Sequence, residues 1–384
     1  MGAFIFSMNS LLLTTVLGLS EVTTGYIMVM IAAFDIVGAL IGGKLSDKYG
    51  RKKVVLLAMA VETVALIFGG IYVRNLVVIF FEVIILTCFS MFYPIIGAMV
   101  TDKTTDGKRE ESFSLLFLCI NIGYGLGQVI AGAIFYNYTE WIFWGQAIAT
   151  VISMALLILF VRDEYVPTEA SSKEVSTSKK TEVTGDRRNL FTMIMRDHPL
   201  VLFLLATVLT GYAYMQVSYL MPLQYADYFG AEISSKWVAK LWTLNSFFCV
   251  IWSPVILKLS KNKNEFLVIM WAAILFMIGM GSFAFIRNIS TAWLVYILTP
   301  IWTAGEVILT VHNSILLGSR ADEDYRGRYQ SLYELTNSIG RMIGPVSMGY
   351  FLIAFSYNQG WILVAALCLV AAVLLYTAYR KDRQ

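Results

Sequence analysis

Residues Gly43–Lys53 read GKLSDKYGRKK and lie between two long apolar runs, residues 26–42 and 54–72. The stretch holds five cations and a single acid, Asp47, which lies between two glycines. A basic segment between two membrane-length runs marks the side of the membrane that it faces, because cytoplasmic loops carry the excess of lysine and arginine. The glycines and the lone acid predict that this tight loop does more than orient the chain.

The composition indicates a membrane protein. Of the 384 residues, 58% are hydrophobic and only 14% are charged, whereas a soluble domain carries about 25% charged residues. The four cysteines lie inside apolar runs and form no CxxC pair. We therefore expect an all-α polytopic membrane protein, with no disulfide and no metal site.

The apolar runs predict twelve transmembrane helices, since a spanning helix needs about 20 largely apolar residues. The first run begins at Met1 and contains Ser7, Asn9 and Ser10, so we expect this helix to be truncated and the natural start to lie upstream. The predicted spans are residues 1–17, 22–43, 53–73, 76–100, 112–136, 140–161, 199–224, 235–257, 264–286, 290–316, 329–355 and 358–379.

The distribution of cations predicts the orientation. Of the 29 lysines and arginines, 24 lie in one set of loops and at the C-terminal end, and four lie in the opposite loops. This bias places both termini in the cytoplasm. Residues 162–198 are rich in Ser, Thr, Lys and Glu, which predicts a cytoplasmic linker between a six-helix bundle at 1–161 and a second at 199–384.

The two halves repeat each other. Shifting the first half by 217 positions superimposes one arginine and three glycines on their counterparts, and these glycines predict faces where helix backbones approach closely. Ordinary helix packing is the simpler explanation of any one of them. The matched positions are Arg109 with Arg326, Gly123 with Gly340, Gly127 with Gly344 and Gly132 with Gly349.

Two six-helix halves joined by a cytoplasmic linker are typical of secondary transporters built from repeats. The pattern Gly43-x-Leu45-x-Asp47-Lys48-x-Gly50-Arg51-Lys52 closely resembles the loop signature of the major facilitator superfamily. The stretches Arg326-Gly327-Arg328 and Ile343-Gly344-Pro345, with Gly305-Glu306, resemble bacterial twelve-helix drug:proton antiporters of that superfamily.

The resemblance implies roles for the basic loop. Gly43 is expected to allow close helix approach and Gly50 a tight turn. Asp47 is expected to join a charge network with Arg51 and Asp102, in a gating loop that also includes Arg109. Such a network would stabilise the state whose cytoplasmic side is closed. A pure orientation signal remains the alternative.

Ionisable residues inside the spans are the candidate coupling sites, because charge at this depth is costly. Glu306 is the strongest candidate, since it lies near the middle of its span and burial favours the neutral form of a carboxyl group. Asp35 and Glu62 are also at mid-depth, and structural roles are as well supported for both. Arg341 is expected to pair with Glu306 or Asp35, and a purely structural Glu306–Arg341 pair is the alternative.

We predict proton-coupled efflux of hydrophobic or cationic small molecules by a monomer in the cell membrane, with the proton gradient and no cofactor supplying energy. Aromatic walls suit hydrophobic cations; Tyr124, Tyr214, Trp242 and Trp302 are candidates, although lipid-facing packing is the better explanation of any single one of them. Uptake of a sugar, peptide or organic acid is the alternative, and a transporter-derived sensor is a third. No Walker motif or catalytic constellation is present, so we expect neither an ATPase nor an enzyme, and no nucleic-acid partner.

Overall fold

The computed structural model describes residues 3–104, 106–161, 196–320 and 326–383. In these ranges the chain forms helices and their connections, without strands. Before the predicted linker lie α1 (Ala3–Phe6), α2 (Asn9–Leu11), a π-helical turn η1 (Leu12–Val16), α3 (Glu21–Tyr49), α4 (Arg51–Ile71), α5 (Val78–Lys103), α6 (Asp106–Ile134) and α7 (Glu140–Phe160).

The second half begins at Asp197, whose side chain accepts a hydrogen bond from the Leu200 backbone nitrogen and so caps the first helix. Its helices are α10 (His198–Phe229), α11 (Ala231–Ser260), α12 (Glu265–Gly281), a 3-10 turn η2 (Ser282–Phe285), α13 (Leu294–Arg320), α14 (Arg326–Ala354) and α15 (Tyr357–Asp382). Residues 162–195 of the predicted linker lie outside the described residues.

Ten of the described helices are long and apolar enough to span a membrane, namely α3 to α7, α10 to α13 and α15. Helix α14 is also long, with 29 residues, and its Ser338 and Arg341 face the space between the halves. The predicted multi-pass helical fold is confirmed.

The first predicted span, residues 1–17, is wrong as a continuous helix. Residues 3–16 form three short segments whose polar side chains bond to helices of the protein. Ser7 donates to the Gln128 side chain of α6, and Ser10 Oγ donates to the carbonyl of Ser218 in α10 at 3.0 Å. A broken helix is tolerated at membrane depth where it is buried in protein, and Ile5 and Leu11 of these segments are fully buried.

The basic stretch is mostly helical, which corrects the predicted loop over residues 43–53. Helix α3 continues to Tyr49, and only Gly50, at φ 95°, makes the turn into α4. The close approach expected at Gly43 occurs one residue earlier. A Cβ at Gly42 would lie 2.7 Å from Met91 Cβ of α5, whereas a Cβ at Gly43 would meet nothing within 4 Å.

The interface between the halves has the symmetry that the sequence repeat predicts. Helix α6 packs on α11, and α14 packs on α3. Gly132 of α6 lies against Ala239 of α11, and Gly349 of α14 lies against Val22 of α3. A shift of 217 positions converts the first of these pairs into the second, so the glycines mark equivalent contacts in a duplicated scaffold.

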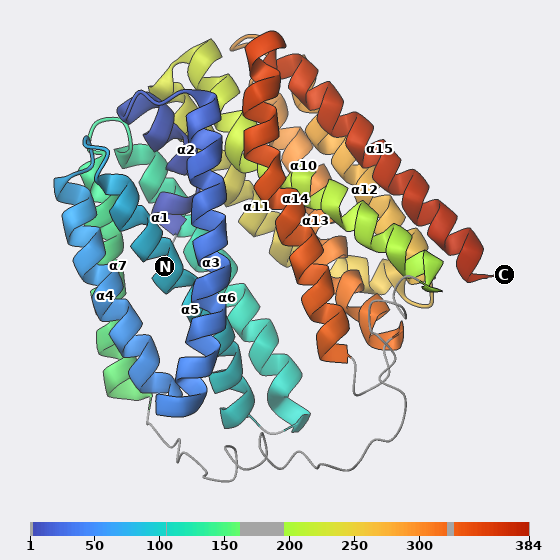
Figure 1. Cartoon of the computed structure of the whole chain (residues 1–384), viewed down its shortest axis with the longest axis horizontal. Helices are drawn as coiled ribbons and strands as arrows, with labels where there is room; N and C mark the ends of the chain where they lie inside the picture. The colour runs from blue at the N-terminus through green and yellow to red at the C-terminus, as the bar shows by residue number, and fades with distance from the viewer. Residues whose placement is uncertain (1–2, 105, 162–195, 321–325, 384) are drawn as a thin grey trace.

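These contacts lie where α3 begins and α14 ends. Tyr26 and Tyr350 bring their hydroxyl oxygens to 3.0 Å, and Tyr219 Oη donates to the Glu21 carbonyl at 2.5 Å. Figure 1 shows α3 and α14 close together at this upper end and diverging toward the lower end, where α3 reaches Tyr49. The contacts of α3 with α14 therefore lie at the end opposite the basic stretch.

Candidate functional site

Glu306 occupies a polar position between three helices of the second half. Its Oε1 accepts a hydrogen bond from the Tyr214 hydroxyl of α10 at 2.9 Å. Its Oε2 accepts from Asn245 Nδ2 of α11 at 2.6 Å, and Cys249 Sγ lies 4.0 Å away. Two good donors stabilise a carboxyl group that would be costly to hold alone at this depth.

Arg341 approaches this carboxyl group through an aromatic ring. The guanidinium carbon lies 4.9 Å from the centroid of the Tyr214 ring, while the Tyr214 hydroxyl donates to Glu306. In the described part of the chain, Arg341 is within salt-bridge distance of neither Glu306 nor Asp35, so the direct pair that we expected is absent from this state. Tyr214 links the cation and the acid, with a cation–π contact on one side and a hydrogen bond on the other.

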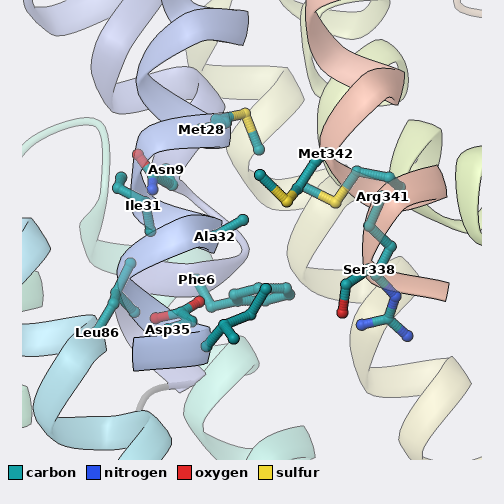
Figure 2. A pocket seen from close by; sticks show the side chains of 12 residues that line it. Phe6, Asn9, Met28, Ile31, Ala32, Asp35, Leu86, Ser338, Arg341 and Met342 are labelled. Carbon is teal, nitrogen blue, oxygen red and sulfur yellow. The ribbon is translucent and has the colours of Figure 1, made fainter. Parts of the chain in front are cut away.

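A cavity of about 170 Å³ lies between the two halves. Figure 2 shows Asp35 of α3 on one wall and Arg341 of α14 on the opposite wall. Asp35 Oδ1 is buried and has no hydrogen-bond partner. The remaining lining is mainly apolar and includes Phe6, Met28, Ile31, Leu86, Met215 and Met342.

An aromatic cluster supports the Glu306 position from within. Trp242 of α11 lies 6.3 Å from both Tyr124 and Tyr214, measured between ring centroids, and 6.1 Å from Trp302. Phe6 of the first half also reaches Trp242, at 6.4 Å. The cluster therefore joins α1 and α6 of the first half to the helices that hold Glu306.

Glu62 does not lie on this cavity. It is fully buried in α4, inside the first half, and both of its carboxyl oxygens lack hydrogen-bond partners. Cys88 of α5 lies close enough to interact with Glu62, whereas Leu86 of the same helix lines the cavity. Helix α5 thus separates Glu62 from the cavity.

The predicted charge network around the basic stretch is present. Arg51 Nε lies 2.5 Å from Asp102 Oδ2 at the end of α5, and Arg51 Nη1 lies 3.9 Å from Asp47 Oδ1. The network ties α3, α4 and α5 together within the first half. The side chain of Arg109 lies outside the described residues.

Removing the Asp47 charge is expected to reduce transport with little effect on stability. The Asp47 side chain is 66% exposed, and exposed ion pairs contribute only about 0–1 kcal/mol. Asp47→Asn should therefore leave thermal unfolding nearly unchanged while weakening the state closed on this side. Transport per copy of the protein is measured in Asp47→Asn and in Lys44→Gln. Lys44→Gln is the control, because it removes a neighbouring exposed charge. Equal transport in both variants would exclude the gating role.

The sequence model of the Major Facilitator Superfamily matches residues 1–333. The chain belongs to this superfamily. It is therefore a multi-pass membrane transporter, and the loop signature, the helical repeats and the interbundle cavity are features of one transporter fold.

Several characterised and uncharacterised superfamily members are similar in sequence. A Na(+), Li(+), K(+)/H(+) antiporter of Planococcus maritimus is 22% identical over 347 residues, which cover 84% of this chain and 80% of the relative. Multidrug resistance protein 2 of Bacillus subtilis (strain 168) is 22% identical, covering 87% and 81%. The class H tetracycline resistance protein of Pasteurella multocida is 24% identical, covering 94% and 87%.

Solved structures share the fold. The nucleoside transporter NupG superimposes with a TM-score of 0.74 at 13% identity, covering 98% of this chain and 95% of NupG. A D-xylose–proton symporter gives a TM-score of 0.72 at 14% identity, covering 97% and 93%. At these identities the likeness concerns the fold of this major facilitator transporter alone.

The predicted packing residues behave differently along the two repeat helices. Gly340 and Gly344 of α14 pack closely on α10, and the carbonyl of Pro345 faces Gly25 of α3. Gly132 and Gly349 form the symmetric contacts described above, and Gly127 is buried. Gly123 differs: a Cβ there would meet nothing within 4 Å, which contradicts the expected packing contact in this state.

Sequence reasoning did not identify Asn245 or Gly25. Asn245 is an amide inside an apolar run, and the rule that polar groups at membrane depth need partners would have selected it. Gly25 has no matching glycine in the second half, because its counterpart 217 positions later is Trp242. Its importance follows only from the contact with Pro345.

Proposed function

We propose that this transporter is a proton-coupled antiporter that exports hydrophobic or cationic small molecules by alternating access. The observation that carries the proposal is the Glu306 carboxyl group, held by Tyr214 and Asn245 and linked through Tyr214 to Arg341 on the cavity wall. The energy source would be the proton gradient across the cell membrane.

Glu306 is suited to exchange a proton. In its ionised form it accepts hydrogen bonds from two neutral donors, and the guanidinium group of Arg341 lies over the Tyr214 ring. When Glu306 takes up a proton, this attraction weakens, and Arg341 is released toward the Asp35 side of the cavity. Proton binding to Glu306 and substrate binding in the cavity would then both change the interactions of Arg341. Each event would alter the free energy of the other, which is the requirement for coupling.

The cavity supports a small apolar or cationic substrate. Methionine side chains adapt to ligands of different shape, and three of them line the walls. The unpartnered oxygen of Asp35 supplies one site of negative charge. A volume of about 170 Å³ is small beside typical ligand pockets of roughly 300–1,000 Å³, so this state would hold a compact ligand or part of a larger one.

The open side would face the cytoplasm if the lysine and arginine bias sets the orientation, with both termini on that side and the chain acting as a monomer. The structure would then correspond to an inward-facing state that loads its cargo from the cell. The relatives named for multidrug and tetracycline resistance support export, and the relative named as a Na(+), Li(+), K(+)/H(+) antiporter supports exchange against protons.

An efflux panel at two external pH values tests the proposal. Cells overexpressing the transporter and cells lacking it are compared for resistance to hydrophobic cations, neutral drugs, Na⁺ and Li⁺, and for growth on single sugars, peptides and organic acids. We expect resistance to hydrophobic cations that increases in acidic medium. Growth on one nutrient that depends on the transporter would instead support proton-coupled uptake.

Asp35→Asn is expected to weaken transport of cationic substrates selectively. Loss of a desolvated charge contact costs at least about 1.5 kcal/mol, so the apparent affinity for cations should fall about tenfold or more while neutral substrates are little affected. Asp227→Asn, which changes an exposed acid at the far end of α10, is the control. An equal loss for neutral and cationic substrates would contradict a charge-recognition role.

A further inference from the structure

A second polar cluster lies inside the first half, away from the cavity. It consists of Glu62 of α4 and of Gln146 and Thr150 of α7, all three of which are fully buried. Both carboxyl oxygens of Glu62, both amide atoms of Gln146 and the Thr150 hydroxyl lack hydrogen-bond partners. Buried polar groups normally have partners, so this concentration of unpartnered atoms requires an explanation.

The packing of α4 on α7 places these side chains at one level. The two helices are antiparallel, and a Cβ at Gly69 of α4 would lie 2.7 Å from the Phe143 ring of α7. Seven residues before Gly69 is Glu62, and seven residues after Phe143 is Thr150. Seven residues are about two helical turns, so Glu62 and Thr150 face each other. Gln146 lies one turn from Thr150, and both face Glu62 closely enough to interact with it.

We propose that Glu62, Gln146 and Thr150 form a binding site for a monovalent metal cation of the size of Na⁺. The three side chains offer four oxygen atoms, namely two carboxylate oxygens, one amide oxygen and one hydroxyl. Hard cations prefer oxygen ligands. One carboxylate and one monovalent cation sum to zero charge, which suits the membrane interior, whereas a divalent cation would leave an uncompensated positive charge.

A proton serves the oxygens of this cluster differently from a cation. A protonated Glu62 donates one hydrogen bond to one neighbouring oxygen, while Gln146 Nε2 and the Thr150 hydroxyl are the donors that its remaining oxygen can accept from. A cation can contact all four oxygens at once. The site is separated from the cavity by α5 and does not depend on the proposed export function.

The helices that the site connects suggest its effect. Glu62 belongs to α4 and the two other ligands belong to α7, while Cys88 of α5 is a further titratable neighbour among the described residues. A bound cation would hold α4 to α7 and stabilise the first bundle, so stability should depend on which cation is present.

Thermal unfolding of the purified full-length protein in detergent tests the site. Solutions of NaCl, LiCl, KCl and choline chloride at equal ionic strength are compared, together with retention of ²²Na⁺. We expect NaCl to raise the unfolding temperature above that in choline chloride by about 2–4 °C, the shift expected for a bundle of this size at a roughly fivefold excess over Kd. Glu62→Gln should abolish the shift and ²²Na⁺ retention, and Thr150→Val should weaken both.

Glu82→Gln is the matched control, because Glu82 is also a fully buried glutamate with both oxygens unpartnered, but in α5. It should keep the sodium shift, as should Asp35→Asn at the cavity. Glu62→Gln preserves the side-chain shape and removes a buried charge, so it is expected to fold. The proposal is overturned if wild type shows no cation-specific shift and retains no ²²Na⁺, or if Glu62→Gln retains both.

Discussion

Replacing Glu306 with glutamine is expected to abolish the part of transport that a pH gradient drives, while the protein remains folded. Glutamine has nearly the same shape as glutamate. Its oxygen can accept the hydrogen bond from Tyr214, which spans 2.9 Å in the wild type, and Asn245 can rotate its amide to accept from the new NH₂ group. The change therefore removes proton exchange at this position and little else. Membrane vesicles with an imposed pH gradient provide the measurement.

Two further variants separate proton exchange from packing. Tyr214→Phe retains the ring under Arg341 and removes only the hydroxyl donor, so coupling should be weakened without being lost. Glu232→Gln changes an exposed acid that pairs with Lys236 and should leave gradient-driven transport intact. If gradient-driven transport persists in Glu306→Gln, the coupling site lies elsewhere, and the contacts of Glu306 are structural.

The sequence predicted the duplicated scaffold well because the glycines at helix contacts recur at the same offset in both halves. Gly132 and Gly349 could be matched through the repeat, and each lies on the interface with the other half. The charge network of Asp47, Arg51 and Asp102 was expected only from the resemblance to a family, because the sequence suggested a loop at 43–53. The structure shows that Asp47 and Arg51 are one helical turn apart.

Features that depend on how a helix is rotated about its axis were not predictable. Gly42 rather than Gly43 faces α5, a difference of about 100° around the helix that composition does not reveal. For the same reason the sequence suggested a direct Glu306–Arg341 pair, whereas Tyr214 lies between them. The placement of Glu62 behind α5 followed from the packing of α4 on α7, and mid-span depth alone gave no sign of it.

Enlarging Gly25 is expected to prevent the two halves from closing on the side opposite the basic stretch. A Cβ at this position would lie 2.8 Å from the Pro345 carbonyl oxygen, 2.9 Å from its carbonyl carbon and 3.0 Å from Val346 Cα. All three are backbone atoms, which cannot move aside as a flexible side chain would. Gly25→Leu should therefore force α3 away from α14 and disfavour the state seen in this structure.

The expected size of the effect follows from the cost of overpacking, about 1–3 kcal/mol. A cost of that size changes the ratio of two conformations by roughly 5- to 150-fold, enough to stop a cycle that must visit both. Crosslinking of Tyr26→Cys and Tyr350→Cys with a bifunctional thiol reagent that spans the space of the two tyrosine rings reports closure, because in the wild type these side chains meet with their hydroxyl groups 3.0 Å apart. The exposed Cys119 is first replaced by serine to remove background labelling.

Gly123→Leu is the matched control for this experiment, since it makes the same change in another glycine of a spanning helix where a Cβ would meet nothing within 4 Å. We expect a high crosslinking yield in the control and a low yield in Gly25→Leu, with transport lost in the latter and normal elution from a sizing column in both. If Gly25→Leu crosslinks as well as the control, the halves tolerate a side chain at this contact. Their closure would then not depend on the approach of α3 to α14, and the symmetric pair Gly132 and Ala239 would have to hold this side of the transporter shut.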